Sequence, residues 1–216
     1  MLFRSNVTGH VVDVTKEEAV VSKFRAAAAD FGGLDVLVSN AGIASAAPFD
    51  ETGIDLWNKN IAVMATGYFL VSREGYKLMK AQGTGGSIVF VSSKNALVAS
   101  KNASAYCTAK ASELHLARCI ALEGAAHGIR VNVVNPDAVL RGSRIWQGDW
   151  KKERAEAYNL SEQQLEEHYR NRSLLKRSVF PEDIAEGVYF FASELSAKST
   201  GNILNVDAGI EGSFTR

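Results

Sequence analysis

Short apolar segments rich in β-branched residues recur along the chain, and longer segments of helical periodicity separate them. Each apolar segment is about six residues long, which is typical of a strand buried on both faces of a sheet. We therefore predict strands at Val7–Asp13, Leu34–Ser39, Ser87–Ser92, Ile129–Val134 and Gly201–Val206.

The segments between these strands carry apolar residues three and four positions apart, as amphipathic helices do. Thr15 and Glu18 have the spacing of a capping box, so the first helix is expected to begin there and to end at Gly32-Gly33. Further helices are predicted from about Ile54 to Lys80, from Ala103 to Leu122, and from Pro181 onward.

The segment 140–177 breaks this alternation because it is long and charged. Ser161 and Gln164 have the spacing of a capping box, which predicts one or two helices standing off the main body. Elsewhere strands and helices alternate, as in an α/β fold whose parallel sheet is covered on both faces. Because no repeat or linker divides the chain, we predict a single domain over 1–216, with a helical insertion on the substrate side at about 140–177.

Charge and cysteine content argue against several classes of partner. The 24 basic and 24 acidic residues cancel, so nothing favours nucleic acid or a membrane surface. No apolar stretch approaches the roughly 18 residues of a membrane span, and no signal peptide opens the chain. Cys107 and Cys119 lie about 18 Å apart along one predicted helix, too far to bridge. We therefore expect a cytoplasmic protein, and the histidines show no spacing that would indicate a metal site.

Tyr106 and Lys110 are four residues apart on the predicted helix from Ala103, so they share one face. A neighbouring ammonium favours a phenolate and is expected to lower the pKa of Tyr106 toward neutrality. Such a phenol can exchange a proton with an alcohol or a carbonyl oxygen. The spacing alone is weak evidence, since an exposed Lys and a half-buried Tyr meet it by chance in many helices.

Other short motifs surround this pair in a particular order. Asn40-Ala41-Gly42 turns the chain after a strand, Ser93 lies thirteen residues before Tyr106, and Asn135-Pro136-Asp137 closes a further strand ahead of Val139. Near the end stand Thr200-Gly201 and Val206-Asp207-Ala208-Gly209. Taken in this order, the motifs resemble those of the short-chain dehydrogenase/reductase family over nearly the whole chain.

The resemblance implies roles for particular residues. Tyr106 would be the general acid/base, Lys110 would lower its pKa and hold the nicotinamide ribose, and Ser93 would hydrogen-bond the substrate oxygen. Cofactor contacts are implied for Asp13, Val14, Asn40, Ala41, Gly42, Tyr106, Lys110, Pro136 and Val139. Asp13 and Val14 match positions that flank adenine in the family, but a plain strand end followed by the entry to a helix is the open alternative for both.

Two departures from the family pattern stand out. The family's glycine-rich phosphate-binding turn does not occur, so we expect a Rossmann-like doubly wound sheet lacking its first β-α-β portion. Met64 also occupies the position of a family Asn that helps to hold a water, and Asn60 is one helical turn, about 5.4 Å, too early to replace it. Proton relay from Lys110 to water is thereby put in question.

The expected function is that of an NAD(P)-dependent oxidoreductase of a small hydroxy or oxo compound, with NAD favoured over NADP. A narrower resemblance, carried by Leu140–Trp146 and Ala197–Gly201, is to the dehydrogenase half of bifunctional rhamnulose-phosphate aldolase/lactaldehyde dehydrogenases. That implies lactaldehyde or a sugar-derived alcohol as substrate. Arg141, Arg144 and Lys151 could meet a carboxylate or simply face solvent. The resemblance also implies a homo-oligomer paired through the two long helices, as family members are. The competing hypothesis is an inactive truncated fold that acts at most as a dimerisation or interaction module.

Overall fold

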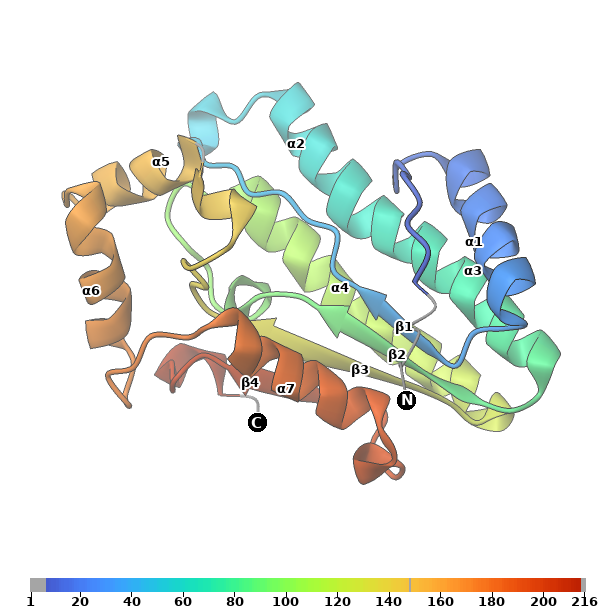
Figure 1. Cartoon of the computed structure of the whole chain (residues 1–216). Helices are drawn as coiled ribbons and strands as arrows, with labels where there is room; N and C mark the ends of the chain where they lie inside the picture. The colour runs from blue at the N-terminus through green and yellow to red at the C-terminus, as the bar shows by residue number, and fades with distance from the viewer. Residues whose placement is uncertain (1–6, 148, 215–216) are drawn as a thin grey trace.

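The protein is seen here in a computed structural model that describes residues 7–147 and 149–214 (Figure 1). Its sheet contains parallel strands in the order β1-β2-β3-β4, each paired with the next. Four of the predicted strands are confirmed within a few residues, as β1 Val36–Ser39, β2 Gly86–Val91, β3 Ile129–Pro136 and β4 Ile203–Val206.

The predicted helices are also present. The helices α2 and α3 are continuous, because a π-helical segment at Ile61–Thr66 joins them. In chain order the helices are α1 Glu17–Phe31, α2 Ile54–Asn60, α3 Gly67–Gln82, α4 Ser104–Gly124, α5 Asp149–Ala157, α6 Glu162–Arg172 and α7 Pro181–Ala192.

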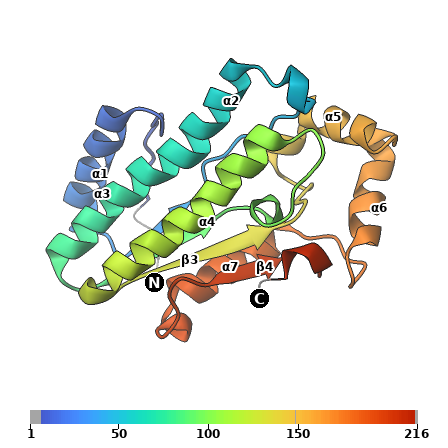
Figure 2. The same cartoon turned by 180° about the vertical axis from the view of Figure 1, so that it is seen from behind.

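Helices cover both faces of the sheet, with α3 and α4 behind it and α7 in front (Figures 1 and 2). Alternate residues of the central strand β2 show both layers. Ile88 and Phe90 pack in the core formed with α3 and α4, whereas Val89 packs with Phe191 of α7. All three β2 side chains are inaccessible to solvent. Burial on both faces explains why these consecutive β2 residues are all apolar.

The prediction of a strand at Val7–Asp13 is wrong. This segment is irregular and largely exposed, with Val11 96% exposed. A strand needs a neighbour to accept and donate its backbone hydrogen bonds, and no strand of the described residues lies beside this segment. The predicted Thr15 cap is wrong as well, because α1 begins at Glu17 and the Thr15 hydroxyl instead donates to Asp13 at 2.7 Å.

The charged insertion forms α5 and α6, which lie beyond the carboxyl ends of the strands (Figure 1). The predicted capping box at the start of α6 is confirmed: the Ser161 hydroxyl accepts from the Gln164 amide, and the Gln164 side chain accepts from the Ser161 amide. Leu165 and Tyr169 bury one side of α6 against α5, so the two helices form a small unit with its own apolar contacts.

The outer surfaces of α3 and α4 carry exposed apolar side chains, Phe69 and Leu122. Pairing of two copies through these helices stays a prediction, and sedimentation of a Leu122→Glu variant tests it, because a buried charge would dissociate the pair. None of the described helices is long and apolar enough to cross a membrane.

Candidate active site

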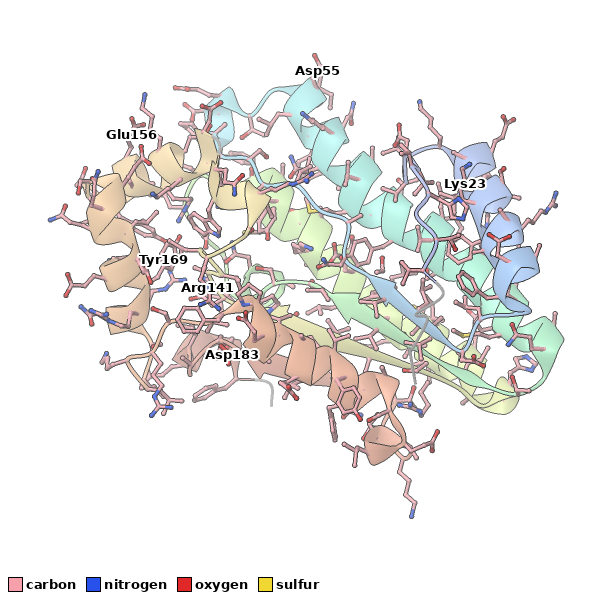
Figure 3. The ribbon with its side chains drawn as sticks, in the orientation of Figure 1. Lys23, Asp55, Arg141, Glu156, Tyr169 and Asp183 are labelled. Atoms are coloured by element: carbon pink, nitrogen blue, oxygen red, sulfur yellow. The ribbon has the colours of Figure 1, made fainter. Side chains whose placement is uncertain are left out.

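A cleft of about 550 Å³ lies at the carboxyl ends of β1, β2 and β3 and is covered from the far side by the insertion. This is the edge at which open parallel sheets bind ligands, because the turns that follow the strands leave a crevice there. The lining combines three groups of residues: the strand ends, the start of α4, and the inner side of the insertion. Figure 3 shows Tyr169 on the inner side of α6, toward this cleft.

Ser93 and Tyr106, predicted to share a site, do lie together in the cleft. Ser93 follows β2 and Tyr106 is in the first turn of α4; they are 9% and 8% exposed. The Ser93 hydroxyl acts to lower the pKa of the Tyr106 phenol. The Trp150 ring lies 5.7 Å from the Tyr106 ring and shields it from water.

Lys110 lies one turn beyond Tyr106 and forms a buried ion pair that the sequence analysis missed. Its ammonium donates to both carboxylate oxygens of Glu113, at 3.0 and 3.2 Å, and the Glu113 side chain has no solvent exposure. Burial raises the pKa of Glu113 to about 7, although Lys110 and Ser92 act against this. The sequence could have predicted this ion pair, because Glu113 is three residues from Lys110 on the same helix face.

The environment of Lys110 corrects the expectation for Tyr106. Lys110 does lower the pKa of the phenol, but burial acts more strongly and Glu113 opposes the ammonium, so the pKa of Tyr106 is raised. Burial also works against the charge of Lys110, yet Tyr68 and Glu113 outweigh it and hold the pKa of Lys110 above its usual value. Tyr106 is therefore a phenol near neutrality, with its ammonium partner fully charged.

The structure shows what replaces the Asn that the family has at the position of Met64. Met64 is wholly buried and packs with Tyr106 and Ala109, so no water can occupy this place. Asn60 is also buried, and its amide donates to Ser45 and to the Leu56 carbonyl at 2.8 Å each. The Lys110 ammonium donates to the Glu113 carboxylate and, at 3.4 Å, to the Val91 carbonyl.

Most of the predicted cofactor-binding residues face the cleft. Asn40, Gly42, Pro136 and Val139 line it, together with Tyr106 and Lys110. A β-carbon at Gly42 would lie 3.9 Å from the Lys110 ammonium, so the turn after β1 passes directly over it. Ala41 belongs to the same turn but does not line the cleft.

The two residues predicted to flank adenine lie outside the cleft lining. Asp13 is exposed and accepts from both the amide and the hydroxyl of Thr15, which lowers its pKa. Val14 packs against Gly67 at the start of α3. Contact with adenine stays a prediction for both. The residues facing the cleft fit the nicotinamide end of a dinucleotide, whereas the described residues contain no glycine-rich turn for its pyrophosphate.

Of the basic residues predicted to meet a substrate, only Arg144 lines the cleft. Arg141 instead pairs with Glu182 at 2.6 Å on the surface, and Lys151 approaches Glu162 at 3.6 Å. Other basic groups, missed from the sequence, occupy the cleft: Lys94, Arg154 and Arg172. No spacing rule indicates them, because the insertion comes from a distant part of the chain.

Comparison with known proteins identifies the family. A family model described as enoyl-(acyl carrier protein) reductase matches residues 3–211. Uncharacterized oxidoreductase YuxG of Bacillus subtilis is 57% identical over 205 residues, which are 95% of this chain and 30% of that protein. A crystal structure of sorbitol-6-phosphate 2-dehydrogenase from Erwinia amylovora matches with a TM-score of 0.89 at 32% identity, over 96% of this chain and 79% of that one. ElxO with NADP bound matches with a TM-score of 0.82 at 28% identity, over 96% and 81%.

The chain therefore belongs to the short-chain dehydrogenase/reductase family, a family of oxidoreductases, and the resemblance drawn from its motifs is confirmed at that level. The expected α/β fold with a parallel sheet is confirmed as well. Because the chain spans only 30% of YuxG, the activity of a whole protein of that length is a separate question.

Proposed function

We propose that this chain performs the hydride-transfer chemistry of an NAD(P)-dependent oxidoreductase that acts on a small hydroxy or oxo compound. The observation that carries the proposal is the meeting of Ser93, Tyr106 and Lys110 in one cleft at the carboxyl edge of the sheet. A hydroxyl, a phenol and an ammonium from two separate segments have no structural reason to converge there. Together they are what proton transfer to a carbonyl oxygen requires.

Each residue has a distinct task in this reaction. Ser93 hydrogen-bonds the substrate oxygen and orients it toward Tyr106. In reduction the phenol of Tyr106 donates its proton to that oxygen; in oxidation the phenolate accepts the proton of the substrate hydroxyl. Lys110 stabilises the phenolate electrostatically, and Glu113 holds the Lys110 ammonium in place. The nicotinamide, when bound, supplies or accepts the hydride.

The cofactor is proposed to be NAD or NADP, with NAD favoured. Asn40, Gly42, Pro136 and Val139 would hold its nicotinamide riboside end, since they line the cleft beside Lys110. Support for a dinucleotide of this class comes from the similar structure of ElxO with NADP bound. Asp13 and Val14 remain candidates for the adenine end.

The substrate is proposed to be lactaldehyde or a sugar-derived alcohol. A similar structure is named sorbitol-6-phosphate 2-dehydrogenase, which supports a polyol-like substrate. We further propose that the chain corresponds to the dehydrogenase half of a bifunctional aldolase/lactaldehyde dehydrogenase. The match to YuxG, of which this chain covers 30%, is consistent with a much longer protein.

Replacing Tyr106 by Phe tests the proposed function. In the protein expressed from its complete open reading frame, Tyr106→Phe should lower kcat by about 10²- to 10⁴-fold, the range for loss of a general acid/base. Cofactor binding, measured by fluorescence titration, should remain. The exposed Tyr189→Phe serves as the matched control. Normal turnover by Tyr106→Phe would show that another group transfers the proton.

A second candidate function, an interaction module without catalysis, has two observations in its favour. The described residues contain no pyrophosphate-binding turn, and the edge strand β1 exposes Val36 and Val38 at 38% and 43%. For the 216 residues alone we expect negligible NAD affinity. Isothermal titration measures it, and micromolar binding would contradict that expectation and count against the module.

A further inference from the structure

The substrate side of the cleft is strongly basic. Besides Lys110, whose charge Glu113 balances, its lining contains Lys94, Arg144, Arg154 and Arg172. Asp137 is the one acidic residue of the lining among the described residues, and Arg172 already binds it: Nη2 donates to both carboxylate oxygens at 2.6 Å. The remaining positive charge is therefore not neutralised within the cleft.

Lys94 is the most unusual of these groups. It follows Ser93 directly, is only 6% exposed, and has no ion-pair partner among the described residues. Its ammonium donates one long hydrogen bond, to the Ser100 hydroxyl at 3.5 Å. An ammonium carries three donors, and burying a charge without a partner is costly. Burial and the nearby Arg172 accordingly lower the pKa of Lys94.

Arg172 and Tyr158 add further unused donors. The Arg172 Nε atom is buried and has no hydrogen-bond partner. The Tyr158 oxygen accepts from Arg154 at 2.6 Å and from Arg172 at 3.4 Å, while its own proton has no acceptor among the described residues. Tyr158 also lines the cleft. Although burial raises the pKa of Tyr158, the guanidinium groups of Arg154 and Arg172 outweigh it and lower that pKa.

We infer that Lys94, assisted by Arg172 and Tyr158, binds an anionic group of the substrate or product, a carboxylate or a phosphate. This inference rests on the proposed function, because it places the reacting oxygen at Ser93 and the anion at the next residue. An anion supplies acceptors for the ammonium, the guanidinium and the phenol, and unlike a neutral hydroxyl or carbonyl it also compensates the positive charge of Lys94. Of the substrates proposed above, this inference favours a sugar-derived alcohol that carries a carboxylate or a phosphate over lactaldehyde, which has no anionic group. Few bonds would separate its reacting oxygen from its anion.

The inference distinguishes Lys94 from the other basic residues of the cleft. Arg154 is buried, but its guanidinium is engaged by the Lys101 carbonyl at 2.7 Å and by Tyr158. Arg154 thus joins α5 to the segment before α4 and shapes the wall. Lys94 makes no comparable protein contact, so a structural role leaves its burial unexplained.

Direct binding tests the inference without turnover or cofactor. Isothermal titration compares lactate with the neutral lactamide, and glycerol 3-phosphate with glycerol. At least one anion should bind at least tenfold more tightly than its neutral counterpart. The tighter of the two anions identifies a carboxylate or a phosphate as the ligand. If neither anion binds more tightly than its neutral counterpart, the inference is overturned.

Variants of Lys94 make the test specific. Lys94→Met should weaken binding of the preferred anion at least tenfold and leave the neutral compound unchanged, while Lys94→Arg should restore most of the affinity. Lys101→Met, at an exposed neighbouring lysine, is the matched control and should change affinity less than twofold.

Thermal unfolding tests whether Lys94 has a structural role instead. Because Lys94→Met removes a buried charge that lacks a partner, its Tm should equal or exceed that of the wild type. A clear fall in Tm together with unchanged anion affinity would assign Lys94 a structural role and overturn the inference. Failure of this inference can be distinguished from failure of the proposed function, because the turnover of Tyr106→Phe tests that function independently.

Discussion

Two lysines next to the candidate reaction centre are buried almost equally and yet differ in their surroundings. Lys110 is 5% exposed and Lys94 is 6% exposed. The ammonium of Lys110 has a buried carboxylate at 3.0 Å, whereas that of Lys94 has a serine hydroxyl at 3.5 Å. Tyr68 and Glu113 outweigh burial and raise the pKa of Lys110, whereas burial and the nearby Arg172 lower the pKa of Lys94.

The difference shows that burial alone does not define what a charged residue does. Lys110 has its counter-ion built into the same helix, so its charge is available at all times to act on Tyr106. Lys94 lacks a built-in counter-ion, so its charge is stabilised best when an anion enters the cleft. A complete ion pair suits a constant electrostatic task, and an incomplete one suits ligand binding.

The largest expected effect is on stability, and it comes from removing the counter-ion of Lys110 so that its ammonium is buried without an ion-pair partner, as that of Lys94 is. Glu113→Gln removes the carboxylate but keeps the side-chain size, leaving a buried ammonium without its counter-ion. Breaking a buried pair in this way costs about 3–5 kcal/mol of unfolding free energy. For a chain of this size, Tm should fall by roughly 6 °C or more in a thermal melt.

The exposed Glu123→Gln on the same helix provides the control and should leave Tm unchanged. An unchanged Tm in Glu113→Gln itself would mean that the Lys110–Glu113 pair contributes little to the free energy of unfolding. The presence or absence of a counter-ion would then not distinguish the two lysines in stability.

The opposite change gives Lys94 the counter-ion that Lys110 has. Ser100 accepts the one hydrogen bond of the Lys94 ammonium, so Ser100→Asp should place a carboxylate beside it. The new pair should weaken binding of the preferred anion about tenfold, the size of a charge-assisted hydrogen bond. Isothermal titration measures this, with Ser100→Asn as the uncharged control. Equal anion affinity in both variants would argue against Lys94 as the binding group.

The smallest expected effect is on the pH dependence of oxidation. Because the pKa of Tyr106 is raised, mainly by burial, the phenolate that accepts the substrate proton forms only at alkaline pH. The kcat/KM for alcohol oxidation should therefore increase as pH rises above neutrality. Glu113 is one of the groups that raise this pKa, so Glu113→Gln should move the increase to lower pH. A profile that is identical in both proteins would exclude electrostatic coupling between Glu113 and Tyr106.

Much of the fold follows from local sequence patterns. β2 and β3 could be predicted because strands buried on two faces are rich in apolar, β-branched residues, and α6 because its capping box satisfies its first amides locally. Val7–Asp13 has the same local pattern as a strand but does not form one, since strand formation depends on a neighbour elsewhere in the chain.

The sequence by itself determined the α/β alternation, the helix face shared by Tyr106 and Lys110, and the place of Ser93 at a strand end. These properties depend on periodicity and on neighbours a few residues away. Only the tertiary structure decided that Tyr106 is buried enough to keep its proton, and that Lys94 lies near Arg172 and Tyr158 without an ion-pair partner among the described residues. Burial and electrostatics depend on groups far apart in the chain, and the position of the insertion over the cleft brings them together.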